Sequence, residues 1–158
     1  MQLLVISDSH SRAAVVDRII RNRKEAKEIF FLGDVTSDIE DLKYEYTDRN
    51  FHIIAGNCDF FSSYPYYDII DIADKKILFT HGHTFNVNTS TDRLLQFGEN
   101  CGADIILYGH THISEVTYKN GIYLINPGSC SKSRNGANSY AIIDIKPNGI
   151  LPSIIKLI

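Results

Sequence analysis

Short, continuously apolar runs alternate with polar clusters along the first third of the chain. Leu3–Ile6, Ile29–Leu32 and Phe51–Ala55 each have the length and composition of a buried strand. Between the first two strands, apolar residues recur at helical spacing, namely Ala13, Val16, Ile19 and Ile20. Ile39–Tyr46 predicts a short helix with three candidate caps, Thr36, Ser37 and Asp38. The alternation of strand and helix predicts a parallel sheet with right-handed crossovers.

The second half of the chain is richer in strands. Tyr67–Ile72 and Lys76–Thr80 predict a hairpin, and Ile105–Tyr108 reads as another buried strand. Between them, Thr89–Cys101 predicts a helix that stops at Gly102. Four more strands with tight turns are expected at Val116–Lys119, Ile122–Ile125, Tyr140–Ile145 and Ile150–Ile155. The pairs Asn120-Gly121 and Asn148-Gly149 are hairpin turn signals.

Composition sets the scale of the molecule. The chain has 158 residues, 44% of them hydrophobic and 22% charged, which is enough apolar material for a core. At roughly 100–200 residues per domain, we expect one domain over residues 1–158. The 16 basic and 19 acidic side chains give a formal net charge of −3. This balance argues against general nucleic-acid binding, because such affinity comes from a basic surface.

The composition favours a cytoplasmic protein. No apolar run approaches the roughly 20 residues that a membrane helix needs, so no membrane contact is expected. The first residues lack a basic region and meet Asp8 too early for a signal peptide. The cysteines are too few, and odd in number, for a disulfide framework; they are Cys58, Cys101 and Cys130.

Polar clusters stand just past the carboxyl ends of the expected strands, where open α/β sheets place their ligand sites. In chain order, these are Asp8 and His10, then Asp34, then Asn57, then His81 and His83, and finally His110 and His112. Glycine stands beside nearly all of them, at Gly33, Gly56, Gly82 and Gly109. Glycine permits tight turns and close approach of the backbone.

These residue types indicate a metal site. Carboxylate, imidazole and amide oxygen suit Mn²⁺, Fe, Zn²⁺ or mixed ions rather than a cysteine-rich structural zinc. The donors are too many for one tetrahedral ion and suit two ions that share a carboxylate; they are Asp8, His10, Asp34, Asn57, His81, His110 and His112. Two-metal sites, with ions about 3.5–4 Å apart, support in-line displacement at phosphorus. Two such ions, two aspartates and a hydroxide leave a local charge of about +1, which would attract phosphate.

Taken in order, these motifs resemble those of the calcineurin-like metallophosphoesterase superfamily. Each motif is weak alone, but the ordered set is specific: Asp8-Ser9-His10, Gly33-Asp34, Gly56-Asn57-Cys58-Asp59, His81-Gly82-His83 and Gly109-His110-Thr111-His112. The small size and Asn126-Pro127-Gly128-Ser129 look most similar to its compact bacterial and archaeal phosphodiesterase branch. The resemblance spans residue 1 to about 145. It implies an α/β fold: a four-layer α/β/β/α sandwich of two mixed sheets flanked by helices.

The resemblance also implies a role for each donor. One ion would be held by Asp8, His10, Asp34 and His112. The other would be held by Asp34, Asn57, His81 and His110, with Asp34 bridging. A metal-bound hydroxide would attack phosphorus, with Asn57 and His83 near the phosphate oxygens. We expect Mn²⁺ as activator, with Ni, Zn, Fe, Co or Mg as the other candidates.

One departure from the superfamily's pattern concerns the general acid. The fuller pattern has a histidine after the Gly-Asn pair, oriented by the next acidic residue and commonly assigned to protonating the leaving group. Here that position is Cys58, followed by Asp59, and the compact branch tolerates cysteine there. General acid catalysis is worth roughly 10²–10⁴-fold, so we expect slow turnover of poor leaving groups. His83 is the other histidine of the site able to act as the acid, and Cys58 itself is the second candidate.

Several residues also have structural interpretations. Cys58 fits equally well as a small buried thiol, and Asp59 and Asp38 fit as turn or cap residues. The turn at Asn126–Ser129 is expected to support the site rather than to act in catalysis. The aromatic cluster Tyr64, Tyr66 and Tyr67 indicates ordinary packing first, and a substrate wall or a homo-oligomer contact second.

The function expected from the sequence is a cytoplasmic phosphodiesterase with two metal ions that acts on small phosphodiesters. A phosphomonoesterase or nucleotide pyrophosphatase with the same site is the alternative within enzymes. A non-catalytic protein-binding scaffold is the alternative from another class, since the retromer scaffold subunit shares this compact fold. A scaffold need not keep seven donors, and here a competent residue fills every expected ligand position. The sequence therefore favours the enzyme.

Overall fold

In the computed structural model, which describes residues 1–158, the first strand contributes to two different cores. This strand is β1 (Gln2–Ile6). Its side chains Leu3 and Val5 pack into one hydrophobic cluster, while Leu4 and Ile6 pack into another. Successive side chains of a strand point to opposite faces of its sheet. A strand buried on both faces is therefore continuously apolar, as this one is.

The first sheet is built around β1. Its strand order is β10-β9-β1-β2-β3, with β2 at Glu28–Phe31, β3 at Asn50–Ile53, β9 at Ser139–Lys146 and β10 at Gly149–Lys156. The strands β1, β2 and β3 run parallel, as the strand–helix alternation predicts. β9 pairs antiparallel with β1 and with β10, so the complete sheet is mixed rather than wholly parallel.

The second sheet has the order β4-β5-β6-β8-β7. The bounds of its strands are Tyr67–Ile72 for β4, Lys75–Thr80 for β5, Ile105–Leu107 for β6, Ser114–Lys119 for β7 and Ile122–Pro127 for β8. β5, β6 and β8 are parallel, and the two edge strands join them antiparallel. This sheet is also mixed.

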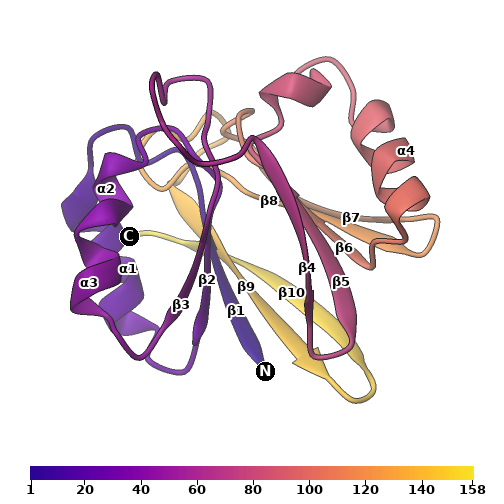
Figure 1. Cartoon of the computed structure of the whole chain (residues 1–158), viewed down its shortest axis with the longest axis horizontal. Helices are drawn as coiled ribbons and strands as arrows, with labels where there is room; N and C mark the ends of the chain where they lie inside the picture. Colours follow the sequence, from indigo (N-terminus) through magenta and orange to yellow (C-terminus); the bar gives the residue numbers. More distant parts are fainter.

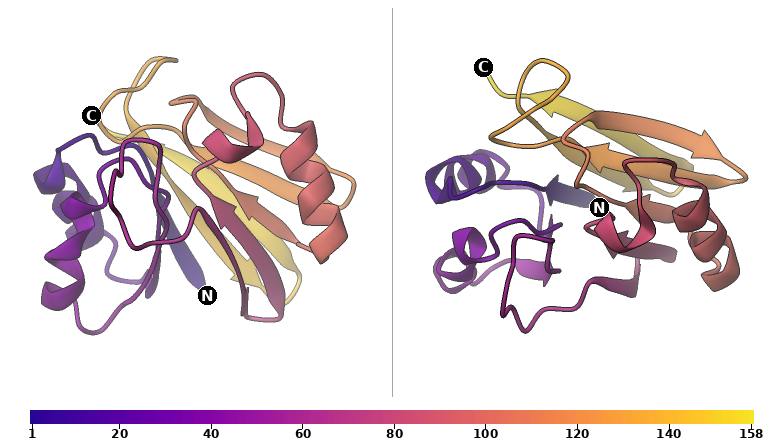
Figure 2. Two further views of the ribbon diagram at one scale, coloured as in Figure 1. Left: turned by 45° about the horizontal axis from the view of Figure 1, so that its top comes forward. Right: turned by 90° about the horizontal axis from the view of Figure 1, so that it is seen from above.

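The two sheets pack face to face with helices on both outer faces (Figures 1 and 2). On the side of the first sheet lie α1 (Ala13–Asn22), α2 (Ser37–Glu40) and α3 (Leu42–Glu45), and on the side of the second lies α4 (Asp92–Cys101). Three hydrophobic clusters fill the three interfaces between these layers. The expected four-layer α/β/β/α sandwich is confirmed.

Two helix predictions need correction. The helix expected at Ile39–Tyr46 is two short helices that meet at Asp41. Asp38, in the first of these helices, is buried. Its carboxylate accepts hydrogen bonds from the hydroxyl of Ser9 (2.6 Å) and the backbone N–H of Arg12 (2.9 Å). Asp38 therefore ties α2 to the loop after β1 and does not cap a helix. The helix expected from Thr89 begins at Asp92, because Thr89 and Ser90 belong to a turn closed on Asn86, whose φ is +57°.

The parallel strands place their carboxyl ends at one end of the sandwich, at the top of Figure 1. The loops that leave β1, β2, β3, β5 and β6 gather there, and Figure 2 brings this end forward. No helix in the structure has both the length and the apolar character needed to cross a membrane.

Candidate metal centre

The loops at this end of the sandwich bring together all seven side chains expected as metal ligands. A first group surrounds Asp8: the donor atoms of Asp8, His10, Asp34 and His112 all lie within 4.8 Å of one another. Nε2 of His112 is 3.1 Å from Nε2 of His10 and 3.2 Å from Oδ1 of Asp8. That carboxylate oxygen is buried and forms no hydrogen bond with the rest of the protein. A buried charged oxygen without a partner is costly, and a bound cation would satisfy it.

A second group surrounds His81, which is fully buried. Its Nε2 lies 3.1 Å from the amide oxygen of Asn57, 3.2 Å from Nδ1 of His110 and 3.4 Å from Oδ1 of Asp34. Four donors from four different loops thus converge on one point. Two facing imidazole nitrogens need a proton or a cation between them, because their lone pairs otherwise repel.

Asp34 lies between the two groups. Its Oδ1 faces His81, while its Oδ2 lies 3.8 Å from Nε2 of His10. The side chain is almost completely buried, so neither oxygen is free to turn to solvent. One carboxylate therefore presents one oxygen to each group of donors.

Backbone carbonyls orient two of the imidazoles. Nδ1 of His81 lies 2.6 Å from the carbonyl oxygen of Leu32, and Nδ1 of His112 lies 2.8 Å from that of Lys132. A carbonyl oxygen cannot donate, so each Nδ1 must carry the hydrogen, and in the neutral ring Nε2 holds a lone pair. Partners of this kind are typical of metal-binding histidines, since they fix both the tautomer and the direction of the ring.

The protonation states also suit a metal. Burial lowers the pKa of His10 and of His110, so both rings are neutral at neutral pH. Burial by itself would raise the pKa of Asp8, but the nearby imidazoles of His112 and His81 outweigh it and hold this pKa below its usual range. Ionised carboxylates and neutral imidazoles are the forms that bind divalent cations. The carboxylate of Asp8 raises the pKa of His112 instead, so a cation would have to displace that proton; the protonation of Asp8, His10 and His110 already fits such ions.

Comparison with protein-family models identifies the family of the chain. Residues 1–148 match the model of the calcineurin-like phosphoesterase superfamily domain. The chain belongs to this superfamily. The resemblance read from its motifs is confirmed.

Three curated proteins show the range of the superfamily around this chain. It is 30% identical over 148 residues to the probable metallophosphoesterase YsnB of Bacillus subtilis, covering 92% of this chain and 85% of that protein. It is 26% identical over 161 residues to phosphodiesterase MJ0936 of Methanocaldococcus jannaschii, covering 91% and 93%. It is also 30% identical over 142 residues to vacuolar protein sorting-associated protein 29 of Schizosaccharomyces pombe, covering 85% and 75%.

A solved structure agrees with this placement. A predicted phosphoesterase from Streptococcus pneumoniae superposes with a TM-score of 0.84 at 26% identity, covering 98% of this chain and 88% of that one. Taken together with the bacterial and archaeal relatives, this match supports a phosphoesterase.

In this member of the superfamily, most of the candidate ligands have an unusual backbone conformation. Five of them have positive φ, which is uncommon for residues other than glycine: Asp8 at 56°, His10 at 45°, Asp34 at 60°, His110 at 69° and His112 at 59°. Each such residue costs on the order of 1–3 kcal/mol, and residues of this kind cluster at functional sites. The surrounding structure must therefore hold these loops in place.

Two glycines allow the loops to approach one another. A Cβ added at Gly56 would lie 2.2 Å from Oδ1 of Asp34 and 2.5 Å from its backbone nitrogen. A Cβ added at Gly109 would lie 2.1 Å from the hydroxyl oxygen of Ser7. Neither distance is sterically allowed. At these two positions, glycine is needed for close packing of the ligand loops.

Asp59 is a functional residue whose part the sequence did not reveal. Its carboxylate accepts hydrogen bonds from the backbone N–H groups of Asp34 (2.9 Å), Val35 (3.0 Å), Thr36 (2.6 Å) and Gly56 (2.7 Å). The interpretation of Asp59 as a simple turn residue is therefore wrong, because it joins the loop after β2 to the loop after β3. Its place two residues after Asn57 was the available signal, but no sequence pattern points to four backbone donors.

Cys58 is exposed, so its interpretation as a small buried thiol is wrong. Its backbone N–H donates to Oδ1 of Asp34 at 2.9 Å, which places it at the rim of the metal centre. Partial desolvation and the negative charge of Asp34 raise the pKa of the Cys58 thiol to about 11. The thiol is consequently neutral at neutral pH and is a weak acid.

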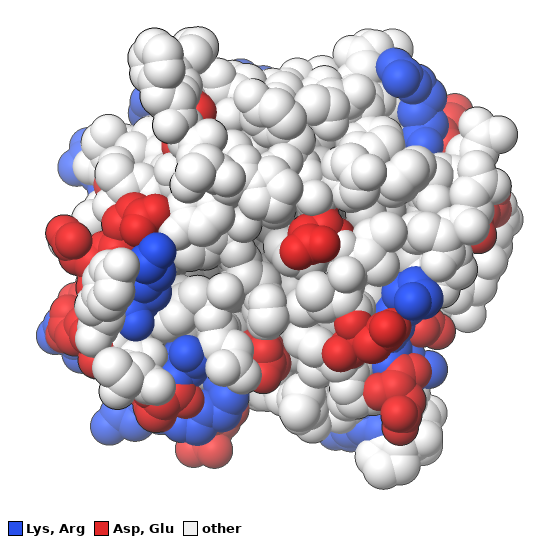
Figure 3. Space-filling model, viewed as in Figure 1, with Lys and Arg blue, Asp and Glu red and all other residues white.

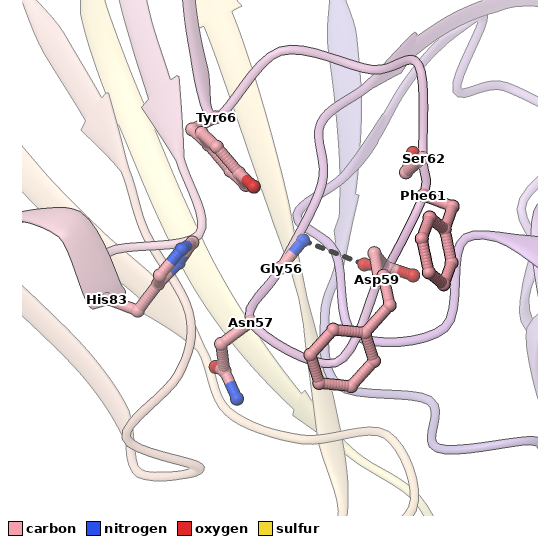
Figure 4. Close-up of a pocket in the computed structure, with 8 residues that line it drawn as sticks. Gly56, Asn57, Asp59, Phe61, Ser62, Tyr66 and His83 are labelled. Atoms are coloured by element: carbon pink, nitrogen blue, oxygen red, sulfur yellow. Dashed lines mark hydrogen bonds between the residues drawn. The ribbon is translucent and has the colours of Figure 1, made fainter.

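His83 faces a cleft beside the second group of ligands. Its Nδ1 is buried without a hydrogen-bond partner, and its ring meets the ring of Tyr66 edge to face, with centroids 5.2 Å apart. Asn57 lines the same cleft, and Figure 4 shows both side chains beside Gly56. The residues expected near a substrate's phosphate thus lie together at the mouth of the metal centre.

The turn at Asn126–Ser129 supports the site, as expected. The side-chain amide of Asn126 donates to the carbonyl oxygen of Gly109 (3.1 Å) and to the hydroxyl of Thr111 (3.0 Å). The hydroxyl of Ser129 donates to the carbonyl oxygen of Asp8 (2.7 Å). This turn thereby holds the backbone of two ligand loops without contributing a ligand.

Proposed function

We propose that the chain is a phosphodiesterase that binds two divalent metal ions, Mn²⁺ by preference, and hydrolyses small phosphodiesters. The observation that carries this proposal is the position of Asp34, whose two oxygens face two separate groups of donors. When bound, a pair of divalent ions lowers the pKa of an attacking water and neutralises phosphate charge. The names of the bacterial and archaeal relatives support a phosphoesterase.

The positions of the side chains indicate which ion each of them would bind and which of them would contact the phosphate. Asp8, His10, Asp34 and His112 would hold one ion, and Asp34, Asn57, His81 and His110 the other. The carbonyl groups behind His81 and His112 keep both rings aimed at the ions. At the mouth of the site, Asn57 and His83 are available to donate hydrogen bonds to phosphate oxygens.

The lining of the cleft supports the proposed preference for a diester. The cleft beside Asn57 and His83 is lined by eight residues, and none of them is lysine or arginine. Figure 3 shows Lys and Arg interspersed with Asp and Glu, and mostly uncharged atoms over the upper part of this face. A phosphomonoester dianion gains from added positive charge, whereas a diester monoanion needs less of it and needs room for a second arm.

The weak acidity of Cys58 shapes the expected substrate range. A thiol with a pKa of about 11 transfers its proton poorly to a leaving group at neutral pH. Esters with activated leaving groups should react well, because their leaving oxygen needs no proton. We propose the cytoplasm as the location of this activity, in keeping with three unpaired cysteines.

The test compares bis-p-nitrophenyl phosphate with p-nitrophenyl phosphate. Metal-stripped protein would be reloaded with Mn²⁺, Mg²⁺, Zn²⁺ or Ni²⁺, and Asp34→Asn is the control, with its fold checked by circular dichroism. Metal-dependent hydrolysis of the diester, lost in Asp34→Asn, is the expected result. Preference for the monoester would replace the phosphodiesterase with a phosphomonoesterase. Folded protein without turnover in any metal would favour a binding scaffold, a role suggested by the similarity to vacuolar protein sorting-associated protein 29.

A further inference from the structure

The cleft that contains Asn57 and His83 has a volume of about 340 Å³ and an unusual lining. Three of its residues are aromatic, namely Phe60, Phe61 and Tyr66. These residues are 80%, 106% and 53% exposed, respectively, so much of their apolar surface faces water. Single exposed aromatic residues are ordinary, but three of them that line one cleft favour a site that binds a ligand.

The loop that carries Phe60 and Phe61 is held firmly at its base. The carboxylate of Asp59 accepts the N–H of Gly56, and the carbonyl oxygen of Asp59 accepts the N–H of Ser62 at 3.2 Å. Within this frame Phe61 has a φ of +68°, a conformation that is a genuine outlier for a bulky residue. Core packing does not require this strain, since the Phe61 side chain contributes to none of the three hydrophobic clusters. Phe61 lines the cleft, and its ring remains exposed to solvent.

The opposite wall of the cleft is also ordered. The ring of Tyr66 stands edge to face against His83, with an angle of 82° between the ring planes. Figure 4 shows Tyr66 and His83 on one side of Gly56 and Asn57, with Phe61 on the other. A planar group that enters the cleft would meet the ring of Tyr66 on one wall and the loop that carries Phe60 and Phe61 on the other. Its other end would lie next to Asn57, where the metal centre begins.

We propose that this cleft binds a planar aromatic group on an ester arm of the substrate, either a nucleobase or a phenyl ring. Phe60, Phe61 and Tyr66 then determine specificity for that arm. The volume lies at the low end of the range for ligand sites, which suits one ring system rather than a large molecule. Stacking on aromatic side chains tolerates any ring with a π-face, so both sources of the ring are compatible with it. The inference rests on the proposed phosphodiesterase function, because the cleft opens from the same Asn57 and His83.

The experiment measures binding separately from catalysis. With Mn²⁺-loaded protein, inhibition constants against bis-p-nitrophenyl phosphate would be measured for methyl benzylphosphonate and for methyl ethylphosphonate, which lacks the ring. The methyl ester of thymidine 5′-phosphate forms a third arm that tests a nucleobase. Calorimetric titration of the two phosphonates gives a readout that does not depend on turnover. The variants are Phe60→Ala/Phe61→Ala and Tyr66→Ala, and the matched control is Tyr44→Ala, which removes an exposed aromatic ring from α3.

We expect the ligand with a ring to bind about tenfold more tightly than methyl ethylphosphonate to the unaltered protein. The cleft variants should lose that preference and keep their affinity for methyl ethylphosphonate, while Tyr44→Ala keeps both. The source of the ring is identified by which of the two ring-bearing ligands binds more tightly.

The inference is overturned if diesters are hydrolysed but no preference for the ring exists, or if the preference survives in the variants. It is also overturned if sedimentation shows a dimer that Phe60→Ala/Phe61→Ala dissociates. Absence of diester hydrolysis with every metal is a different result, since it refutes the proposed function first.

Discussion

The carboxylate of Asp59 accepts a hydrogen bond from the backbone N–H of Asp34, 25 positions earlier in the chain, at 2.9 Å. The same carboxylate accepts the next two N–H groups, so it holds a turn in which Asp34 and Val35 both have positive φ. Asp34 presents an oxygen to each group of metal donors only while this turn keeps its shape. Asp59 is thus a positioning residue for the metal centre, although it faces no ion.

Replacement of Asp59 tests this relationship. In Asp59→Asn the amide nitrogen would face backbone N–H groups, and buried charge-assisted hydrogen bonds are worth about 1.5–3 kcal/mol each. We expect a loss of about 3 kcal/mol in the free energy of unfolding and a fall of about 10–100-fold in metal affinity. Urea unfolding and calorimetric metal titration measure the two effects. The control is Asp71→Asn, which changes an exposed carboxylate on β4. Metal affinity that is unchanged in Asp59→Asn would show that the turn does not depend on this residue.

Gly56→Ala should distort the site by steric conflict alone. The added methyl group would lie 2.2 Å from Oδ1 of Asp34, so the carboxylate must move away from His81. We expect metal affinity and diester turnover to fall by about 10–100-fold while the protein remains folded. Gly102→Ala is the matched control, because its methyl group would meet nothing within 4 Å. That control should lose about 1 kcal/mol of stability at its left-handed C-cap and keep its activity. Equal activities in the two variants would contradict the prediction.

The leaving-group dependence of the rate tests the part played by Cys58. We expect turnover of methyl aryl phosphates to fall steeply from 4-nitrophenol to phenol as leaving group, because a neutral thiol is a poor proton donor. Cys58→His should raise the phenyl ester rate by about tenfold or more and change the 4-nitrophenyl rate little. Cys58→Ser controls for loss of the thiol. Equal rates across the leaving groups in the unaltered protein would mean that an efficient acid, with His83 as the candidate, is already present.

The buried thiol of Cys130 predicts a change of stability with pH. Burial, with the charges of Asp8 and Asp38, raises the pKa of Cys130 to about 12 from an ordinary value of 9.0. Between these values the unfolded chain releases the thiol proton and the folded chain keeps it, so stability must fall as pH rises. From pH 8 to pH 10 this one group should remove about 1 kcal/mol from the free energy of unfolding. Urea unfolding at both pH values, for the unaltered protein and for Cys130→Ala, measures the difference. An identical pH response in the two proteins would refute the prediction.

The individual strands and the gathering of the candidate ligands could be predicted from local sequence, whereas the four-layer sandwich was implied by the family resemblance of the ordered motifs. A continuously apolar run such as Leu3–Ile6 indicates a strand buried on both faces, and β1 does contribute side chains to two clusters. Polar residues that follow such runs, with glycine beside them, gather at one edge of a sheet by geometry alone. The four histidines assigned as ligands therefore came together as expected.

The rest depends on contacts between distant segments, which leave little trace in a local pattern. Asp59 reads as a turn residue until the loop after β2 is folded beside it. Helical spacing runs through Asp41, yet the contact of Asp38 with the loop after β1 accompanies a break in the helix there. The tyrosines expected as one cluster lie apart: Tyr64 is hydrogen-bonded to Lys43, Tyr66 lines the cleft, and Tyr67 packs on Phe97. Phe60 and Phe61 follow neither helical nor strand periodicity, so the exposure of their rings could not be predicted from the sequence.

The hydrogen bond from Ser129 to the carbonyl of Asp8 spans 121 positions of the chain. A ribosome adds roughly 5–20 residues per second, so on the order of ten seconds separates the synthesis of these two residues. During that interval β1 also lacks β9, its neighbour on one side in the finished sheet. The nascent chain therefore carries Asp8 and His10, its first two candidate ligands, long before it can hold them in position. In the proposed function, the complete set of candidate ligands can be held in place only after nearly all of the polypeptide has emerged, so metal binding would be a late event in the maturation of this protein.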